Sequence, residues 1–328
     1  MKISKIGEFG LIERIRKRAN RVSKRKEILT GIGDDCAVIK NTGTEYLLVT
    51  TDTLSENVHF SKKYFSAFDI GYKSLAVNLS DIAAMGGIPM CCLVTLCLPN
   101  SITIKEIDEL YRGINFLAAK YNVQVIGGDI IKSLSGLTVS ISLIGKTLNK
   151  RGILRNGAAP GDNIFCTGSF GDSAAGLFAF QKGIAGMKYL KEKHLRPNAR
   201  IQEGIYLART GKITSMIDSS DGLDKSLRIL CEESKTGCVI DYDKIPISAE
   251  LKRFTSLTGI GLERMALYGG EEYELIFTAS QKHSAVFSKK FSKIGIVTKQ
   301  KQISYINKTG KVIKIGDRGF DHFSLRDK

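Results

Sequence analysis

The chain has 328 residues, which is long for one hydrophobic core, so we expect two domains. Its formal net charge of +16 favours anionic ligands, but the basic residues are spread along the chain, and we expect no nucleic-acid binding. The longest nearly unbroken apolar run, residues 88–98, is too short to span a bilayer. Seven cysteines without a C-x-x-C pair are typical of reduced thiols. We therefore expect a cytoplasmic protein without membrane contact.

The first half of the chain alternates strands and helices. The patterns predict a helix at 7–19, a glycine turn at 31–35, strands at 36–39 and 46–49, and a helix at 68–85. A strand at 90–98, a helix at 104–121 and strands at 123–126 and 137–144 follow. This alternation indicates an α/β or α+β domain.

The second half begins after a polar, glycine-rich stretch at 149–160, the best candidate for a domain boundary. We predict strands at 163–167, 215–217 and 275–277, helices at 174–181, up to Arg209 and up to Glu233, and short strands and turns to 323. The loop at 168–173 could cradle a phosphate, or could simply join a strand to a helix.

Acidic residues follow apolar runs at several places, including Asp52, Asp129 and Asp218. The glycine turn at 31–35 ends in Asp35, and the predicted helix at 68–85 carries Asp81. A single aspartate after a strand is more often a turn former or a helix cap. Several converging carboxylates would repel one another unless a cation lay between them, and Mg²⁺ prefers such oxygen ligands together with substrate phosphates. The series therefore predicts a Mg-nucleotide site.

Residues 140–147 end like a Walker A loop, but Ser140 stands where the first glycine belongs and the interior alternates like a strand. We expect the nucleotide to be held in another way. Cys36 lies beside two carboxylates that should raise its thiol pKa, so we interpret it as a packing residue and not as a nucleophile. His59 is either structural or in contact with a phosphate or substrate.

Seven motifs together carry a family resemblance. They are Gly-Glu-Phe at 7–9, Gly-Ile-Gly-Asp-Asp-Cys-Ala at 31–37, Thr-Thr-Asp-Thr-Leu at 50–54, Ala-Val-Asn-Leu-Ser-Asp-Ile-Ala-Ala-Met-Gly at 76–86, Gly-Gly-Asp at 127–129, Asp-Ser-Ser-Asp-Gly-Leu at 218–223 and Gly-Gly-Glu-Glu-Tyr-Glu-Leu at 269–275. In this order they closely resemble the thiamine-monophosphate kinase family, over almost the whole chain. Ser219 replaces the leucine more usual in the sixth motif.

The resemblance implies an aminoimidazole ribonucleotide synthetase-like fold of the α/β (α+β) class with two domains. Residues 1–148 would form an N-terminal ATP- and Mg-binding domain that dimerises through its sheet. Residues 149–328 would form a C-terminal α/β domain that completes the active-site cleft. A homodimer is thus an expectation from the resemblance alone.

The resemblance also implies roles for individual residues. Several Mg²⁺ ions would be held by Asp35, Thr50, Thr51, Asp52, Asp81, Asp129, Asp218 and Asp221. ATP would contact Gly128, Asp129, Arg155 and Ser220, and thiamine monophosphate would contact His59, Glu271 and Phe320. The catalytic residues would be Asp52, Asp81, Asp218 and Arg155. Tyr111 is placed either to stack on the adenine or to pack in the core.

The implied reaction is phosphorylation of thiamine monophosphate to thiamine diphosphate by ATP, through direct in-line transfer with Mg²⁺. Two alternatives stay open. One is another ATP-dependent enzyme of the same superfamily. The other is a non-enzymatic nucleotide- or nucleic-acid-binding protein, whose nucleic-acid affinity should fall steeply with salt.

Overall fold

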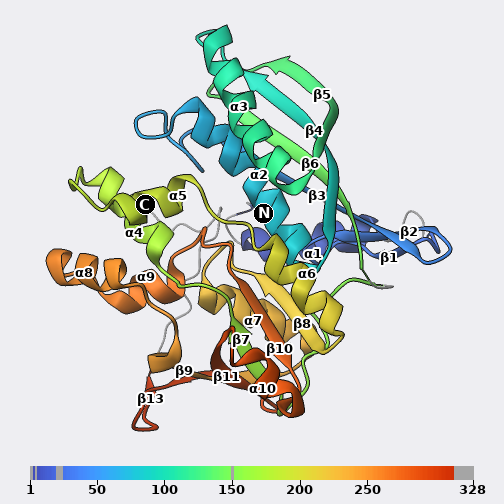
Figure 1. Cartoon of the computed structure of the whole chain (residues 1–328), viewed down its shortest axis with the longest axis vertical. Helices are drawn as coiled ribbons and strands as arrows, with labels where there is room; N and C mark the ends of the chain where they lie inside the picture. The colour runs from blue at the N-terminus through green and yellow to red at the C-terminus, as the bar shows by residue number, and fades with distance from the viewer. Residues whose placement is uncertain (1–2, 4–5, 20–24, 149–150, 314–328) are drawn as a thin grey trace.

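The computed structural model describes residue 3 and residues 6–19, 25–148 and 151–313 of the chain. Each half of the chain builds one sheet with helices against it, and the two halves pack together around the helix α2 (Figure 1). The expected class, a two-domain α/β (α+β) fold, is confirmed. The division at residues 148 and 149 stays a prediction, because 149–150 lie outside the described residues.

The first half forms a sheet with the strand order β1-β2-β3-β6-β4-β5 in the described part of the chain. β4 and β5 are parallel and the other pairs are antiparallel. Its elements are α1 (Gly7–Ala19), β1 (Ile28–Thr30), β2 (Ala37–Thr42), β3 (Glu45–Ser55), α2 (Ala67–Ala84), β4 (Ile88–Leu98), α3 (Ile104–Tyr121), β5 (Gln124–Lys132) and β6 (Thr138–Lys146).

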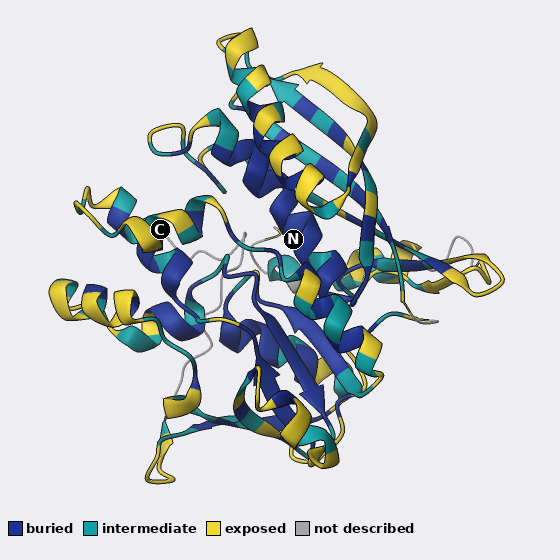
Figure 2. Cartoon of the chain, viewed as in Figure 1, coloured by how far each residue is buried: buried dark blue, intermediate teal, exposed yellow. Residues whose placement is uncertain are grey.

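Helices α2 and α3 pack against each other and cover one face of this sheet. Leu48, Val94 and Ile141 point to that face and are fully or almost fully buried. The edge strand next to β4, β5, is exposed along most of its length, as Figure 2 shows. One face and one edge of the first sheet are therefore uncovered within the described chain.

The second half forms a sheet with the order β13-β12-β9-β11-β7-β10-β8 among the described residues, in which the β12–β9 pair is parallel. Short 3₁₀ helices lie at Tyr242–Lys244 and Gln281–His283. The other elements are β7 (Asn163–Cys166), α4 (Asp172–Gln181), α5 (Lys188–Leu195), α6 (Ile201–Thr210), β8 (Ile213–Asp218), α7 (Leu223–Ser234), β9 (Gly237–Asp241), α8 (Ala249–Thr258), α9 (Leu262–Tyr268), β10 (Leu275–Ala279), α10 (Ser284–Phe287), β11 (Ser292–Thr298), β12 (Ile303–Ile306) and β13 (Val312–Ile313).

Helix α2 joins the two halves. It begins at a capping box in which Ser66 and Asp69 satisfy each other's backbone N–H groups. It contacts β3 and β6 of the first sheet and also α5, α6 and β8 of the second half. Gly204 of α6 lies so close that a Cβ there would be 2.3 Å from the carbonyl oxygen of Ala83. The side chains of α2 are consequently buried on almost all sides.

Two predicted strand ends are in the wrong place. Thr50, Thr51 and Asp52 were expected to follow a strand, but they lie within β3, and the Gly-Gly-Asp at 127–129 lies within β5. Both strands continue because one face of the sheet is open and accepts polar side chains. The residues 140–147 lie in or directly after β6, as expected of a strand and not of a P-loop.

Within the described residues, no helix is both long and apolar enough to cross a bilayer.

Candidate active site

A cavity of about 640 Å³ lies where α2 and β3 of the first half face the second half. It brings together most of the predicted site residues. Those that line it are Asp35, Thr50, Thr51, Asp52, His59, Asp81, Arg155, Asp218, Ser220, Asp221 and Glu271.

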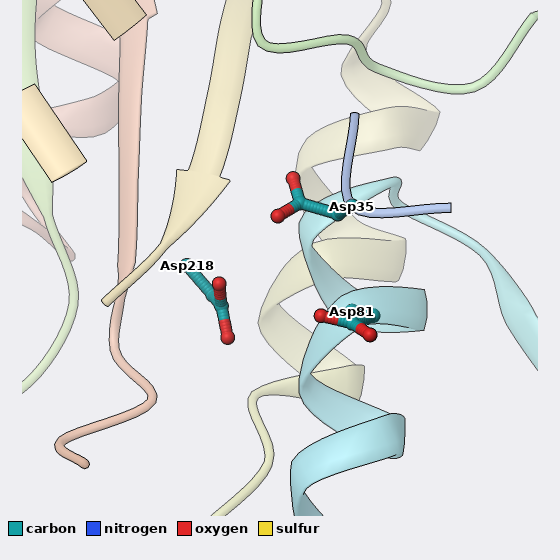
Figure 3. Close-up of side chains that lie close together, drawn as sticks. All are labelled: Asp35, Asp81 and Asp218. Atoms are coloured by element: carbon teal, nitrogen blue, oxygen red, sulfur yellow. The ribbon is translucent and has the colours of Figure 1, made fainter. Parts of the chain in front are cut away.

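Three carboxylates converge at this cavity from distant parts of the chain. Asp35 lies in the turn before β2, Asp81 in α2 and Asp218 at the end of β8, as Figure 3 shows. One carboxylate oxygen of each lies within 4.8 Å of those of the other two. Asp35 and Asp218 are buried, with 7% and 4% of their surface exposed. Such a cluster of buried charges needs compensation.

Hydroxyl groups hold two of these carboxylates in place. Thr50 Oγ1 donates to Asp81 Oδ2, and Ser80 Oγ donates to Asp218 Oδ2 at 2.6 Å. Thr50 is on β3 and points to the side covered by α2. Thr51, the next residue, lies on the opposite face, and its hydroxyl donates to the carbonyl oxygen of Ile141 at 3.2 Å.

Asp35 is paired with Arg155. The guanidinium donates from Nη2 at 2.6 Å and from Nε at 3.1 Å, both to Asp35 Oδ1. Burial alone would lower the pKa of Arg155, but the charge and hydrogen bonds of Asp35, together with the charges of Asp34 and Asp218, outweigh burial and raise the pKa. The second oxygen, Asp35 Oδ2, is buried and has no hydrogen-bond partner among the described residues. An unpaired buried carboxylate oxygen is an available ligand for a cation.

The pKa values of the clustered carboxyls show how strongly they repel. Burial, followed by the charge of Asp35, raises the pKa of Asp218 to about 7. Burial and the charges of Asp52 and Asp218 raise the pKa of Asp81 well above its usual range. Burial and the charge of Asp221 raise the pKa of Asp52 to about 6. Near neutral pH the cluster therefore holds protons that a bound cation would displace.

The donor set fits a hard divalent cation. All the convergent ligands are carboxylate or hydroxyl oxygens, which Mg²⁺ prefers to nitrogen or sulfur. A bound cation would offset the repulsion between the carboxylates and lower their pKa values. It would also give Asp35 Oδ2 a partner. Asp35, Asp81 and Asp218 are the residues best placed to hold such an ion.

Asp34 and Asn78 also belong to this region, although the sequence analysis did not select them. The backbone N–H of Arg155 donates to the two Asp34 carboxylate oxygens at 3.2 and 3.3 Å. Burial and the neighbouring Asp35 raise the pKa of Asp34 to about 7. Asn78 Oδ1 accepts from the backbone N–H of Asp52 at 3.1 Å. The sequence could have indicated Asp34, because it stands beside Asp35 in the Gly-Asp-Asp turn. For Asn78 the only indication was its place in the motif at 76–86.

The loop after β8 supplies Ser220 and Asp221. Asp221 is paired with Lys225 at 2.9 Å. The backbone carbonyl of Ser220 accepts from the N–H of Glu271 at 2.6 Å, which ties this loop to the Gly-Gly-Glu-Glu segment. Ser219, the residue that departs from the usual motif, is fully buried behind them.

His59 and Glu271 lie at the other end of the cavity, where it adjoins a second cavity of about 710 Å³. His59 Nδ1 accepts from the backbone N–H of Ser55 at 3.1 Å. Glu271 contacts two residues that the sequence analysis missed, Lys73 at 2.7 Å and His194 at 3.3 Å. Lys73 gave no signal, because a lysine in a helix normally faces solvent.

Three predicted or considered residues are placed elsewhere, and the structure does not describe a fourth. Gly128 and Asp129 lie on β5 and do not line the cavity; Gly128 is packed so closely that a Cβ would be 1.8 Å from the carbonyl oxygen of Val94. Tyr111 lies in α3, partly buried against the core. Phe320 lies outside the described residues. The roles assigned to these residues stay predictions.

Cys36 is buried beside the acidic cluster. Burial and the charge of Asp81 raise the pKa of its thiol well above the usual range. A thiol that stays protonated is a poor nucleophile, so the structure agrees with a packing role.

Two family models match the chain. Residues 33–147 match the AIR synthase related protein, N-terminal domain, and residues 159–308 match the AIR synthase related protein, C-terminal domain. The thiamine-monophosphate kinase of Bacillus subtilis (strain 168) is 36% identical over 330 residues, covering 96% of this chain and 99% of the relative. That of Escherichia coli (strain K12) is 36% identical over 333 residues, covering 97% and 98%.

Solved structures agree with these relatives. AaThiL complexed with AMPPCP and TMP superposes with a TM-score of 0.87 at 32% identity, covering 98% of this chain and 99% of that chain. The hydrogenase maturation protein HypE in complex with ATP has a TM-score of 0.68 at 16% identity and covers 93% and 95%. The second likeness is one of fold alone.

Proposed function

The chain belongs to the thiamine-monophosphate kinase family, and we propose that it transfers the γ-phosphoryl group of ATP directly to thiamine monophosphate with the help of Mg²⁺. The observation that carries this proposal is the convergence of Asp35, Asp81 and Asp218 beside Arg155 in the cavity between the two halves. A site of this kind suits a reaction in which two polyanions must approach one another.

Mg²⁺ bound by these carboxylates would neutralise the phosphate charges and the charge that develops on the leaving ADP. The protein's own contribution is to fix the metal-binding carboxylates in position before the cation binds. Thr50 and Ser80 fix the carboxylates of Asp81 and Asp218, and Arg155 fixes that of Asp35. Arg155 also lines the cavity, where its guanidinium can contact a phosphate oxygen.

The acceptor is a phosphate oxygen that is already ionised near neutral pH, so the reaction needs no general base. Orientation of the two substrates is then the main task of the protein. We infer a single in-line displacement without a phosphoenzyme. A transfer from ATP that carries a chiral γ-phosphoryl group should therefore invert its configuration, whereas retention would indicate a covalent intermediate.

We place the acceptor at the end of the cavity that contains Glu271 and His59. Glu271 is an ionised carboxylate: burial alone would raise its pKa, but the Lys73 ammonium, with smaller contributions from His194 and His59, lowers the pKa overall. An anionic group suits the cationic thiazolium ring of thiamine monophosphate. The adjoining cavity, lined in part by the stacked rings of Tyr64 and Phe180, has room for an aromatic ring.

We also propose that the protein is a homodimer through its first sheet. The support is a group of exposed apolar side chains on the two neighbouring strands β4 and β5: Leu93 at 40% exposure, Ile126 at 53%, Ile130 at 67% and Ile131 at 50%. An exposed apolar edge of this kind favours association with another copy. A cytoplasmic location is proposed from the seven cysteines, none of which forms a disulfide.

An acceptor comparison tests the proposed function. The purified protein is incubated with Mg-ATP and thiamine monophosphate, thiamine or no acceptor, and thiamine diphosphate and ADP are quantified by chromatography. We expect stoichiometric ADP and thiamine diphosphate with the monophosphate alone. ADP release that does not depend on thiamine monophosphate would instead favour another ATP-dependent enzyme of the superfamily.

A further inference from the structure

Lys73 is a fully buried lysine on α2, the helix that also carries Asp81. Its side chain has 0% exposed surface. The ammonium lies 2.7 Å from Glu271 Oε1, donates to the backbone carbonyl of His59 at 3.4 Å and lies 5.2 Å from the ring centroid of Phe65. Burying an ammonium group is unfavourable unless its partners are well placed. Lys73 therefore connects the His59 segment and the Glu271 segment.

Glu271 needs such support because its backbone is unusual. Its φ is +65°, in the left-handed region that residues other than glycine adopt rarely. The side chain keeps 24% of its surface exposed and borders both cavities. A strained backbone that presents a carboxylate at a cavity is typical of a functional position.

His194 completes the surroundings of Glu271. Its Nδ1 lies 3.3 Å from Glu271 Oε2 and 3.3 Å from Ser173 Oγ. Burial and the nearby Lys73 lower the pKa of His194 to about 3, so the ring is neutral. His194 thus packs against the carboxylate as a neutral group, and the ammonium of Lys73 is the charge that holds it.

We propose that Lys73 is a positioning residue for the acceptor substrate. It holds the carboxylate of Glu271 and the backbone of His59 as one unit, so that both face the place where the two cavities meet. The ligand class is a cationic heteroaromatic ring that carries a phosphate. This inference rests on the proposed function, since it assigns the acceptor to the Glu271 end of the cavity.

The test compares steady-state kinetics of wild type and Lys73→Met, which keeps most of the side-chain volume and removes the charge. We expect the KM for thiamine monophosphate to rise at least about 10-fold and the KM for ATP to change less than about 2-fold. Arg196→Met is the matched control. It breaks another ion pair of α2, Arg196 to Asp69 at 2.6 Å, whose residues do not line the cavity. We expect it to leave both KM values unchanged.

Lys73→Met leaves the Glu271 carboxylate without its partner and could fail to fold. The double variant Lys73→Met, Glu271→Gln removes both charges, so it can be compared with Glu271→Gln even in that case. We expect Glu271→Gln and the double variant to have the same raised KM for thiamine monophosphate. Equal increases of both KM values in Lys73→Met would indicate a merely structural role and overturn the proposal.

The remaining outcomes are distinct. An unchanged KM for thiamine monophosphate in Lys73→Met, beside an active wild type, overturns the positioning role alone. If wild type forms no thiamine diphosphate, the proposed function itself fails.

Discussion

The carboxylates of Asp35, Asp81 and Asp218 lie close enough to repel one another, and burial strengthens that repulsion. Burial and this repulsion raise the pKa values of Asp81 and Asp218. The same residues that favour cation binding should therefore reduce the stability of the metal-free protein. A substitution that removes one charge should affect function and stability in opposite directions.

Asp218→Asn tests this expectation. Asparagine keeps the shape of the side chain and an oxygen for Ser80, so we expect the fold to persist. The turnover number at saturating Mg-ATP should fall at least about 100-fold, because one charged ligand is lost. The melting temperature in a chelator should be unchanged or higher.

Asp241→Asn, at the end of β9 and outside the cavity, is the control and should keep its turnover. Full turnover in Asp218→Asn would contradict the assigned role of Asp218.

His194 predicts a pH dependence of stability. Its pKa is lowered to about 3 in the folded protein, against 6.5 for an ordinary histidine. The unfolded chain therefore binds a proton between these values that the folded chain does not, so stability is lost as pH falls below about 6.5. Between pH 7 and pH 5 the loss from this residue should be about 2 kcal/mol.

Urea denaturation at pH 5, 6 and 7 measures this slope. The carboxyl groups with raised pKa contribute an opposite slope, so the informative quantity is the difference between wild type and His194→Gln. That difference should shrink towards low pH. The same comparison for the partly exposed His283, whose pKa is lowered only by slight desolvation and by Lys212 and Lys282, should change much less. Parallel pH profiles for wild type and His194→Gln would show that His194 titrates normally.

At the scale of residues, the sequence predicted the acidic part of the site better than its supports. Asp35, Asp52, Asp81 and Asp218 each follow or lie within a distinctive motif. Lys73 and His194 gave no comparable signal, because each contacts Glu271, which lies more than 70 positions away along the chain. Single-sequence patterns do not contain such contacts.

At the scale of elements, α2 is the part on which the site depends. It carries Asp81 and Lys73 and packs against strands of both sheets, so it lies between the two halves and contributes side chains to the site. The helix itself was predicted from its apolar pattern to within a residue or two. Its burial on almost all sides was not, since a polar residue such as Lys73 or Asn78 in a helix normally indicates an exposed face.

Gly204→Ala tests the packing of α6 on α2. The added methyl group would lie 2.3 Å from the carbonyl oxygen of Ala83, so the helices must separate. We expect a loss of stability of about 1–3 kcal/mol, as for other overpacked cores, measured by urea denaturation.

Gly261→Ala is the control, because its Cβ would meet no atom within 4 Å and its φ of −61° suits alanine. Gly261 is the N-cap of α9, where alanine is less favourable than glycine, so the loss should be at most about 1 kcal/mol and smaller than that of Gly204→Ala. Equal stability of Gly204→Ala and wild type would mean that α6 and α2 are less closely packed in solution.

The strands show where sequence patterns are insufficient. β3 and β5 extend through polar and glycine-rich motifs that were expected to end them. A strand on a sheet with one open face tolerates polar residues, and only the tertiary arrangement reveals which face is open.

At the scale of the whole molecule, the uncovered strand β5 would contribute both to the proposed dimer and to the proposed ligand contacts. Gly128 and Asp129, which we expect to contact nucleotide and metal, lie on it and outside the cavity of this chain. The oligomeric state is therefore the property most worth measuring alongside activity.

Ile130→Asp tests the proposed dimer. Ile130 is 67% exposed on β5, and a buried aspartate in an apolar interface would be costly. Light scattering during size-exclusion chromatography should give about twice the 36.0 kDa chain mass for wild type and the chain mass for the variant.

Leu134→Asp, at a residue that is 96% exposed just beyond β5, should remain a dimer. A monomeric wild type would contradict the proposed assembly.

The most direct test of the account is a ³¹P nuclear magnetic resonance time course of wild type with ATP and thiamine monophosphate, with Mg²⁺ and with excess chelator. We predict that the resonances of ADP and thiamine diphosphate appear together with Mg²⁺ and not with the chelator, and that Asp81→Asn abolishes both. Product formation at the wild-type rate with chelator, or in Asp81→Asn, would contradict the claim that the acidic cluster holds the catalytic cations.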